Sequence, residues 1–230
     1  MKAIKRFVLV FLFSTLLFSQ EKNSRSVFVE RKNSFGIFAG MGVDLVAAGD
    51  VVDYVNSLTS YDQRVGNFST AVDFFGGVEI PVNDEWGIKI EHSYLFKSYS
   101  VLGNSGGTYD FFYAVNAPSV LVQRVISGTG YFVKFGAGGG YHFGSASQTV
   151  STFGATTTYV AQGVGIKAEL VGQTAFDENF YGYIGGTIGW EFVGKLKDDK
   201  GAALVHPGTA TSVSLNYFNS GIRFGVMYYL

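Results

Sequence analysis

Charged side chains recur at alternate positions in several stretches of this 230-residue chain, between small or apolar neighbours. Successive side chains of a β-strand point to opposite sides, so this spacing places the charges on one face of each strand. Such a face can pair its charges as buried ion pairs, line a water-filled pore, or bind a ligand. The set comprises six acidic and five basic residues: Asp44, Asp73, Glu79, Lys89, Glu91, Lys97, Lys134, Lys167, Glu169, Glu191 and Arg223.

The near balance between acidic and basic residues favours buried ion pairs over the other roles. A selective pore tends to display an excess of one sign, whereas a filled interior needs paired charges because an unpaired buried ion costs several kcal/mol. We therefore interpret the eleven residues as a structural charge network. A role in conduction or ligand binding is the alternative.

Catalytic and cofactor chemistry find little support. A hydrolytic triad needs Ser, His and an acid together, yet the adjacent His92 and Ser93 point to opposite faces of one strand. His142 is expected to face inward as a polar residue, and His206 lies in a loop beside Pro207 without neighbouring ligands. Scattered histidines do not form a metal site. No catalytic residue, metal site or cofactor is therefore predicted.

Two further classes of ligand are excluded. Gly163, Gly165 and Ala168 match the G-x-G-x-x-A dinucleotide fingerprint, but the match lies inside an alternating strand rather than between a strand and a helix. The formal net charge is only −1 and no arginine cluster is present, which excludes nucleic acid as a partner. The chain has no Cys and therefore no thiolate chemistry.

Eight alternating stretches are expected to position the charges. Each places aromatic and aliphatic side chains on one face and glycines and charges on the other. They cover residues 35–45, 68–80, 86–97, 109–125, 131–143, 160–170, 180–192 and 221–230. The connections alternate between long (46–66, 99–108, 145–157 and 193–210) and short (81–85, 127–130 and 173–178).

Alternating connections of this kind are typical of an all-β, eight-stranded antiparallel transmembrane β-barrel. A soluble barrel would enclose the apolar face, but the aromatic side chains, 17% of the residues, exceed what a small lumen holds. With glycines and charges inside, an apolar outer face also explains why only 15% of residues are charged. In this register His92 faces lipid, unless a bulge shifts the third strand.

The N-terminus indicates export. Lys2, Lys5 and Arg6 precede an apolar run over residues 7–18 and then Ser19, which predicts a signal peptide over residues 1–19. A polar lead over residues 20–33 follows, and the barrel occupies residues 34–230. In the first long connection, residues 50–58 predict a short helix with Asp50 as its cap and Val51, Val55 and Leu58 on one face. This helix would cover the mouth of the barrel.

The whole pattern resembles the small outer-membrane barrels of the OmpA and OmpX type. The pairing of NAPSVLVQRVI with YFVKFGAGGGYHFG, residues 116–126 and 131–144, is also similar to strands four and five of the "outer membrane β-barrel domain" proteins of Bacteroidetes-like bacteria. The resemblance implies an outer-membrane location and recognition of the final strand, IRFGVMYYL, by the barrel-assembly machinery. That strand ends in Leu230, where the family usually has Phe or Trp.

We accordingly expect a monomeric structural or interaction protein in outer-membrane lipid, with a plugged polar lumen and four surface loops that meet an unknown extracellular partner. The alternatives are a narrow channel or carrier for small apolar solutes and, with less support, a lipid-modifying enzyme. Fold alone does not choose among them.

Overall fold

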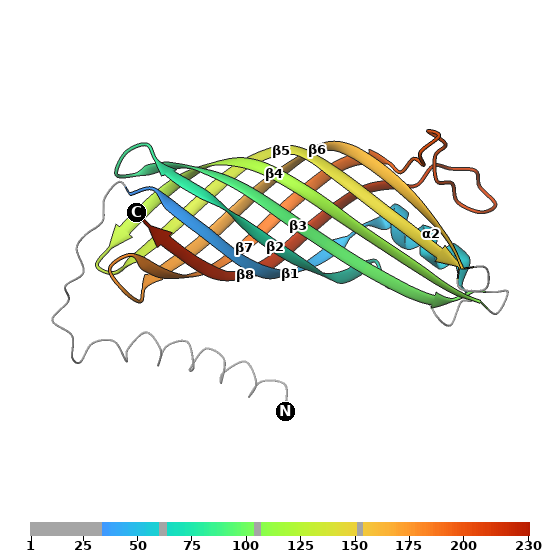
Figure 1. The fold of residues 1–230 in the computed structure, drawn as a ribbon, viewed down its shortest axis with the longest axis horizontal. Helices are drawn as coiled ribbons and strands as arrows, with labels where there is room; N and C mark the ends of the chain where they lie inside the picture. Colours follow the sequence, from blue (N-terminus) through green and yellow to red (C-terminus); the bar gives the residue numbers. More distant parts are fainter. Residues whose placement is uncertain (1–33, 60–63, 104–106, 151–153) are drawn as a thin grey trace, which may run out of the picture.

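A computed structural model describes residues 34–59, 64–103, 107–150 and 154–230. The expected signal peptide and polar lead lie outside these residues. The eight strands close into a barrel in chain order, each antiparallel to its neighbours, with β8 paired to β1 (Figure 1). The elements are β1 (Gly36–Ala47), α2 (Gly49–Leu58), β2 (Phe68–Pro81), β3 (Trp86–Leu102), β4 (Thr108–Gly128), β5 (Tyr131–Val150), β6 (Ala155–Ala175), β7 (Phe180–Lys195) and β8 (Ser214–Tyr229). The expected fold class is confirmed.

The outer wall is apolar because the alternate residues predicted to face outward do so. In β1, Ile37, Met41, Val43 and Leu45 are each about half exposed, while Asp44 between them is buried. The other strands repeat this pattern through most of their length. A continuous apolar band on a closed β-barrel is stable in a lipid bilayer, whose core satisfies no backbone polar group. The described part of the chain contains no helix with the length and hydropathy needed to cross a bilayer.

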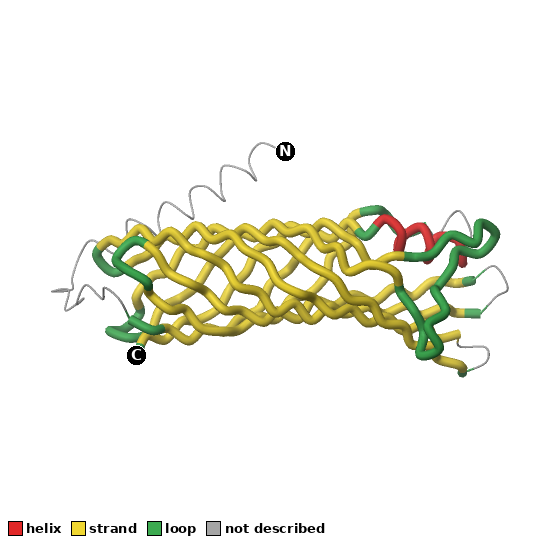
Figure 2. Tube along the Cα trace, turned by 90° about the horizontal axis from the view of Figure 1, so that it is seen from above, coloured by secondary structure: helices red, strands yellow, loops and turns green. Residues whose placement is uncertain are grey.

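The connections at the two ends of the barrel differ in length and structure (Figure 2). Short turns join β2 to β3, β4 to β5 and β6 to β7 at one end, which we call periplasmic because barrels of this kind place short turns there. The other end, called extracellular below, carries α2 and residues 196–213. At this end the strands β3, β4, β5 and β6 extend beyond the adjacent strands β2 and β7. The β2–β3 ladder stops at Val72 and Phe96, whereas β3 and β4 remain paired as far as Leu102 and Thr108.

We call this extension the projecting sheet; it comprises residues 97–103, 108–115, 144–150 and 155–163. The sequence placed parts of it in loops, with long connections at 99–108 and 145–157, and that prediction was wrong. Serines and threonines on the outward face, such as Ser98, Ser100 and Thr158, hide the alternation that Tyr99 and Val101 continue on the inner face. The sequence prediction also missed the start of β8, because polar residues such as Asn216 and Ser220 hide the alternation before residue 221.

The predicted helix is present and its apolar face is buried. Val51 and Val55 have no exposed surface, and they pack into an apolar layer that we call the extracellular cluster. Its members include Val46, Tyr99, Phe111, Tyr113, Val115, Leu196, Leu204, Val213, Leu215 and Tyr217. Asp50 is not the cap: the helix starts at Gly49, and the Asp50 carboxylate instead accepts a hydrogen bond from the Ser214 hydroxyl at 2.5 Å.

Tyr54 gives the docking of α2 a measurable pH dependence. Burial raises the pKa of its phenol from 10 to about 12, and the hydroxyl donates to Gln148 Oε1 at 2.6 Å. Because the raised pKa belongs to the docked state, its stabilising contribution is complete below pH 10 and is lost as the pH rises through about 12. We expect the difference in 295-nm absorbance between the parent and Tyr54→Phe to titrate near pH 12. A difference titrating at pH 10 would show an undocked helix.

A second apolar layer closes the opposite end of the lumen. This periplasmic cluster comprises Phe38, Phe75, Val171, Ala175, Tyr181, Tyr183, Met227 and Tyr229. Its rings pack closely, with the Tyr181 and Tyr229 centroids 5.1 Å apart. Inward aromatic residues thus interrupt the glycines and charges of the inner face near both ends. The lumen is therefore layered.

Candidate functional site: the charged lumen

Ten of the eleven predicted charged residues lie buried in the lumen, each no more than 7% exposed. We call these ten the charged layer. They occupy the lumen between the two apolar clusters and overlap the periplasmic one, since the Lys89 ammonium lies 4.6 Å from the centre of the Phe38 ring. The members are Asp44, Asp73, Glu79, Lys89, Glu91, Lys134, Lys167, Glu169, Glu191 and Arg223.

Glu91 contacts three cations of this layer. Its Oε1 lies 2.5 Å from Lys167 Nζ and 2.7 Å from Arg223 Nη1, and its Oε2 lies 2.7 Å from Lys89 Nζ. Lys89 also contacts Glu169 Oε2 at 2.8 Å. One carboxylate thus contacts three cations, two of them from other strands, which joins the layer into one network.

Arg223 joins two carboxylates of the layer. Its guanidinium contacts Asp73 Oδ2 at 2.5 Å as well as Glu91, and not Glu79 or Glu191. The register explains the choice: Gly42 of β1 lies opposite both Arg223 of β8 and Asp73 of β2. Because Gly42 has no side chain, Arg223 passes over β1 to reach a carboxylate two strands away.

The same arrangement occurs on the other side of the barrel. Gly136 of β5 lies opposite both Gln123 of β4 and Glu169 of β6, and Gln123 Nε2 donates to Glu169 Oε1 at 2.9 Å across it. A Cβ at Gly136 would lie only 3.0 Å from Glu169 Cγ. Inward glycines at these positions therefore allow polar groups on next-but-one strands to meet.

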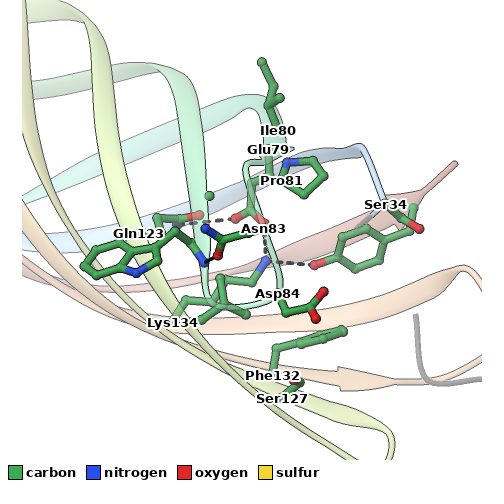
Figure 3. A pocket seen from close by; sticks show the side chains of 14 residues that line it. Ser34, Glu79, Ile80, Pro81, Asn83, Asp84, Gln123, Ser127, Phe132 and Lys134 are labelled. Atoms are coloured by element: carbon green, nitrogen blue, oxygen red, sulfur yellow. Dashed lines mark hydrogen bonds and ion pairs between the residues drawn. The ribbon is translucent and has the colours of Figure 1, made fainter. Parts of the chain in front are cut away.

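A small cavity opens at the periplasmic mouth (Figure 3). Glu79, Gln123 and Lys134 converge at its inner end, where Lys134 is ion-paired with Glu79. Lys134 Nζ also donates to the Tyr229 hydroxyl at 2.8 Å, which in turn donates to Gln173 Oε1 at 2.6 Å. The cavity volume is about 60 Å³, room for a few water molecules rather than a solute.

Lys97 and Asp44 depart from the expected pairing. Lys97 is half-buried outside the charged layer, with its ammonium 5.3 Å from the centre of the Tyr99 ring, and it forms no ion pair with the described residues. Asp44 accepts from Asn219 Nδ2 at 2.8 Å, but its Oδ2 meets no donor among the described residues.

Sequence reasoning missed a chain of hydrogen bonds through His142. His142 Nε2 lies 3.1 Å from Ser119 Oγ, and Nδ1 contacts the Glu191 carboxylate. A Cβ at Gly165, which lies opposite Glu191, would overlap this pair. The three residues come from β4, β5 and β7, so only the strand register could have revealed their contact.

Ser119, His142 and Glu191 contact one another in the order of a Ser-His-acid triad, but they are not accessible to a substrate. Ser119 is 3% exposed and His142 is 1% exposed, so a substrate cannot reach the hydroxyl oxygen. Nucleophilic catalysis requires the reacting carbon within about 3 to 3.5 Å of the nucleophile. The arrangement therefore acts as a buried polar contact between three strands.

The remaining candidates from the sequence do not assemble into a site. His92 faces outward, opposite Gly76 and Pro118, and β3 pairs with both neighbours without a shift of register, so the bulge alternative is excluded. His206 lies in the 196–213 connection, its ring 5.9 Å from that of Tyr54. Residues 163–168 lie inside β6. Within the described ranges, no three His, Asp or Glu side chains are grouped to hold a metal ion.

Solved structures share this architecture. The chain is similar to Neisserial surface protein A (NspA), with a TM-score of 0.51 and 9% identity over 87% of this chain and 100% of that one. It is also similar to a major outer membrane protein from Thermus thermophilus, with a TM-score of 0.52 and 14% identity over 86% and 100% of the two chains. The fold is that of the small outer-membrane β-barrels.

This outer-membrane barrel fold and the apolar outer band together place the chain in an outer membrane. No family model matches the sequence, and no curated protein matches it. The narrower resemblance to the Bacteroidetes barrel proteins stays a prediction.

Proposed function

We propose that the chain is a closed outer-membrane barrel whose function is structural or interactive rather than conductive. The observation that carries this proposal is the filling of the lumen by three successive layers. The extracellular cluster with α2, the charged layer and the periplasmic cluster each bury side chains from several strands. A solute would have to displace all three layers to cross the membrane.

The projecting sheet supports an interactive role. Much of it extends past the apolar band, and many of its outward residues are small or polar, including Ser98, Ser100, Asp110, Thr156 and Thr158. Its inner face is covered by α2, as the 5.7 Å separation of the Tyr54 and Phe111 rings shows. The sheet and the four extracellular connections would present a stable surface to an extracellular partner.

The remaining partners follow from the same proposal. A monomer is expected, with lipid surrounding the wall and the barrel-assembly machinery recognising β8, whose Phe224, Val226 and Tyr228 face outward. A carrier for small apolar solutes is the second candidate, because the extracellular cluster is apolar and α2 could move away from it. A lipid-modifying enzyme is disfavoured by the burial of Ser119.

Conductance separates these functions. The refolded barrel is expected to leave a planar lipid bilayer at its baseline current, because paired charges and packed rings leave no continuous water path. Discrete, reproducible channel openings at moderate voltage would overturn the proposal and favour the channel.

Cysteine labelling provides an independent measurement, since the natural chain has no Cys. Ser119→Cys places a thiol in the middle of the lumen, and Ser100→Cys places one on the exposed face of β3. A small membrane-impermeant thiol reagent should modify the Ser100→Cys control rapidly and leave the Ser119→Cys barrel unmodified until it is unfolded. Equal labelling of both would show an open lumen.

A further inference from the structure

The outer wall of the barrel is hollowed where β6 and β7 separate near the extracellular end. Their ladder stops at Val164 and Phe192, and pairing resumes only at Val160, whose backbone N and O bond to Lys197 at 2.7 and 2.9 Å. Between these points β7 turns at Gly194, where φ is +88°, and buries Val193. A groove of about 830 Å³ results, and its outward-facing lining includes Asn116, Phe143, Ser145, Val160, Gln162, Lys195 and Lys197.

The groove lies at the upper edge of the apolar band. Phe143 and Val160 are the last exposed apolar residues of the band on β5 and β6, and the next outward residues are Ser145 and Thr158. Gln162 and Lys195 supply polar groups at the same level. In a membrane this boundary coincides with the lipid headgroups of the extracellular leaflet.

The charged side chains that line the groove are two lysines, Lys195 and Lys197, and two aspartates, Asp198 and Asp199. Lys195 and Lys197 are exposed on its rim. Asp198 keeps its negative charge, but its Oδ1 accepts the backbone N–H groups of Lys200 at 3.0 Å and Ala202 at 2.8 Å, and these two donors of its own turn partly offset that charge. Asp199 is the remaining acidic residue of the lining. Two ammonium groups above an apolar floor match the polarity of an anionic lipid, with its head above its chain.

We propose that this groove binds a lipid of the extracellular leaflet whose phosphate headgroup carries a net negative charge. The phosphate lies between Lys195 and Lys197, and an acyl chain follows Phe143 and Val160 down the wall. The site depends on the membrane location of the barrel and not on whether the lumen conducts.

The two tryptophans allow a direct test. Trp190 faces lipid on β7 just below the groove, opposite Ile166, whereas Trp86 lies at the periplasmic end of β3. In the Trp86→Phe background, the barrel is refolded into phosphatidylcholine vesicles containing either brominated phosphatidylglycerol or brominated phosphatidylcholine. The preference for the anionic lipid is measured by comparing how strongly the two brominated lipids quench Trp190. We expect each lysine to increase this preference about fivefold.

Charge removal should abolish this preference. We expect Lys195→Gln combined with Lys197→Gln to reduce it to near unity, with a retained heat-modifiable gel shift showing that the barrel has folded. Lys200→Gln is the matched control, because Lys200 lies in the same connection but does not line the groove. Equal quenching by the two lipids in the parent, or an undiminished preference in the double variant, would overturn the proposal. An equal loss in Lys200→Gln would also overturn it, in favour of general surface charge.

Discussion

Replacing Glu91 by Gln is expected to lower the free energy of unfolding by about 3 to 5 kcal/mol. The substitution keeps the shape of the side chain but removes the negative charge that Lys89, Lys167 and Arg223 share. Lys89 would then keep only Glu169 and Arg223 only Asp73 as ion-pair partners, and Lys167 would lose its contact with Glu91. Urea unfolding of the barrel in detergent micelles, followed by its mobility on unheated gels, measures the difference.

Glu85→Gln is the matched control, because it removes a carboxylate that is paired but exposed. The Glu85 and Arg124 side chains are 61% and 46% exposed and lie 3.0 Å apart, a setting in which an ion pair contributes less than about 1 kcal/mol. If Glu91→Gln proved as mild as Glu85→Gln, water would have to screen the charged layer, and the lumen would not be filled as proposed above.

Gly140→Val is expected to destabilise the barrel by about 3 kcal/mol or more, or to prevent its assembly. A Cβ at this inward position would collide with the carbonyl oxygen of Pro118 on β4, a backbone atom that cannot rotate away. The same urea titration and the yield of heat-modifiable protein measure the effect.

Gly186→Val tests whether valine itself is the cause. Gly186 faces outward on β7, and a Cβ there would have no neighbour closer than the Gly221 carbonyl oxygen at 3.9 Å. This variant should be as stable as the parent. If the two valine variants behaved alike, the close approach of β4 and β5 at Pro118 would not be a constraint.

The face of each strand was predictable from the sequence, whereas the partners within the lumen were not. Alternation alone decides that Asp73 and Arg223 point inward, because the period of a strand is two. Which charges meet depends on the register of non-adjacent strands, and Arg223 reaches Asp73 only because Gly42 lies between them. The Ser119, His142 and Glu191 contacts required the same information from three strands.

Strand length was the second property that the sequence did not reveal. Exposed Ser and Thr residues are typical of loops, yet in the projecting sheet they occupy the outward positions of paired strands. The inner positions Tyr99, Phe111 and Tyr113 stay buried because α2 packs over them. The helix and the strand extensions therefore depend on each other, and a local pattern cannot show that dependence.

The contact of Arg223 with Asp73 across Gly42 links the chemistry of the lumen to the order of folding. The two residues lie on β8 and β2, so they can meet only after the last strand has paired with the first. Until then Glu91 lacks one of its three cations and Asp73 lacks its own. Closure of the sheet therefore forms these ion pairs together with the backbone hydrogen bonds between β1 and β8, so we expect the final step of folding to be cooperative for reasons beyond backbone hydrogen bonding.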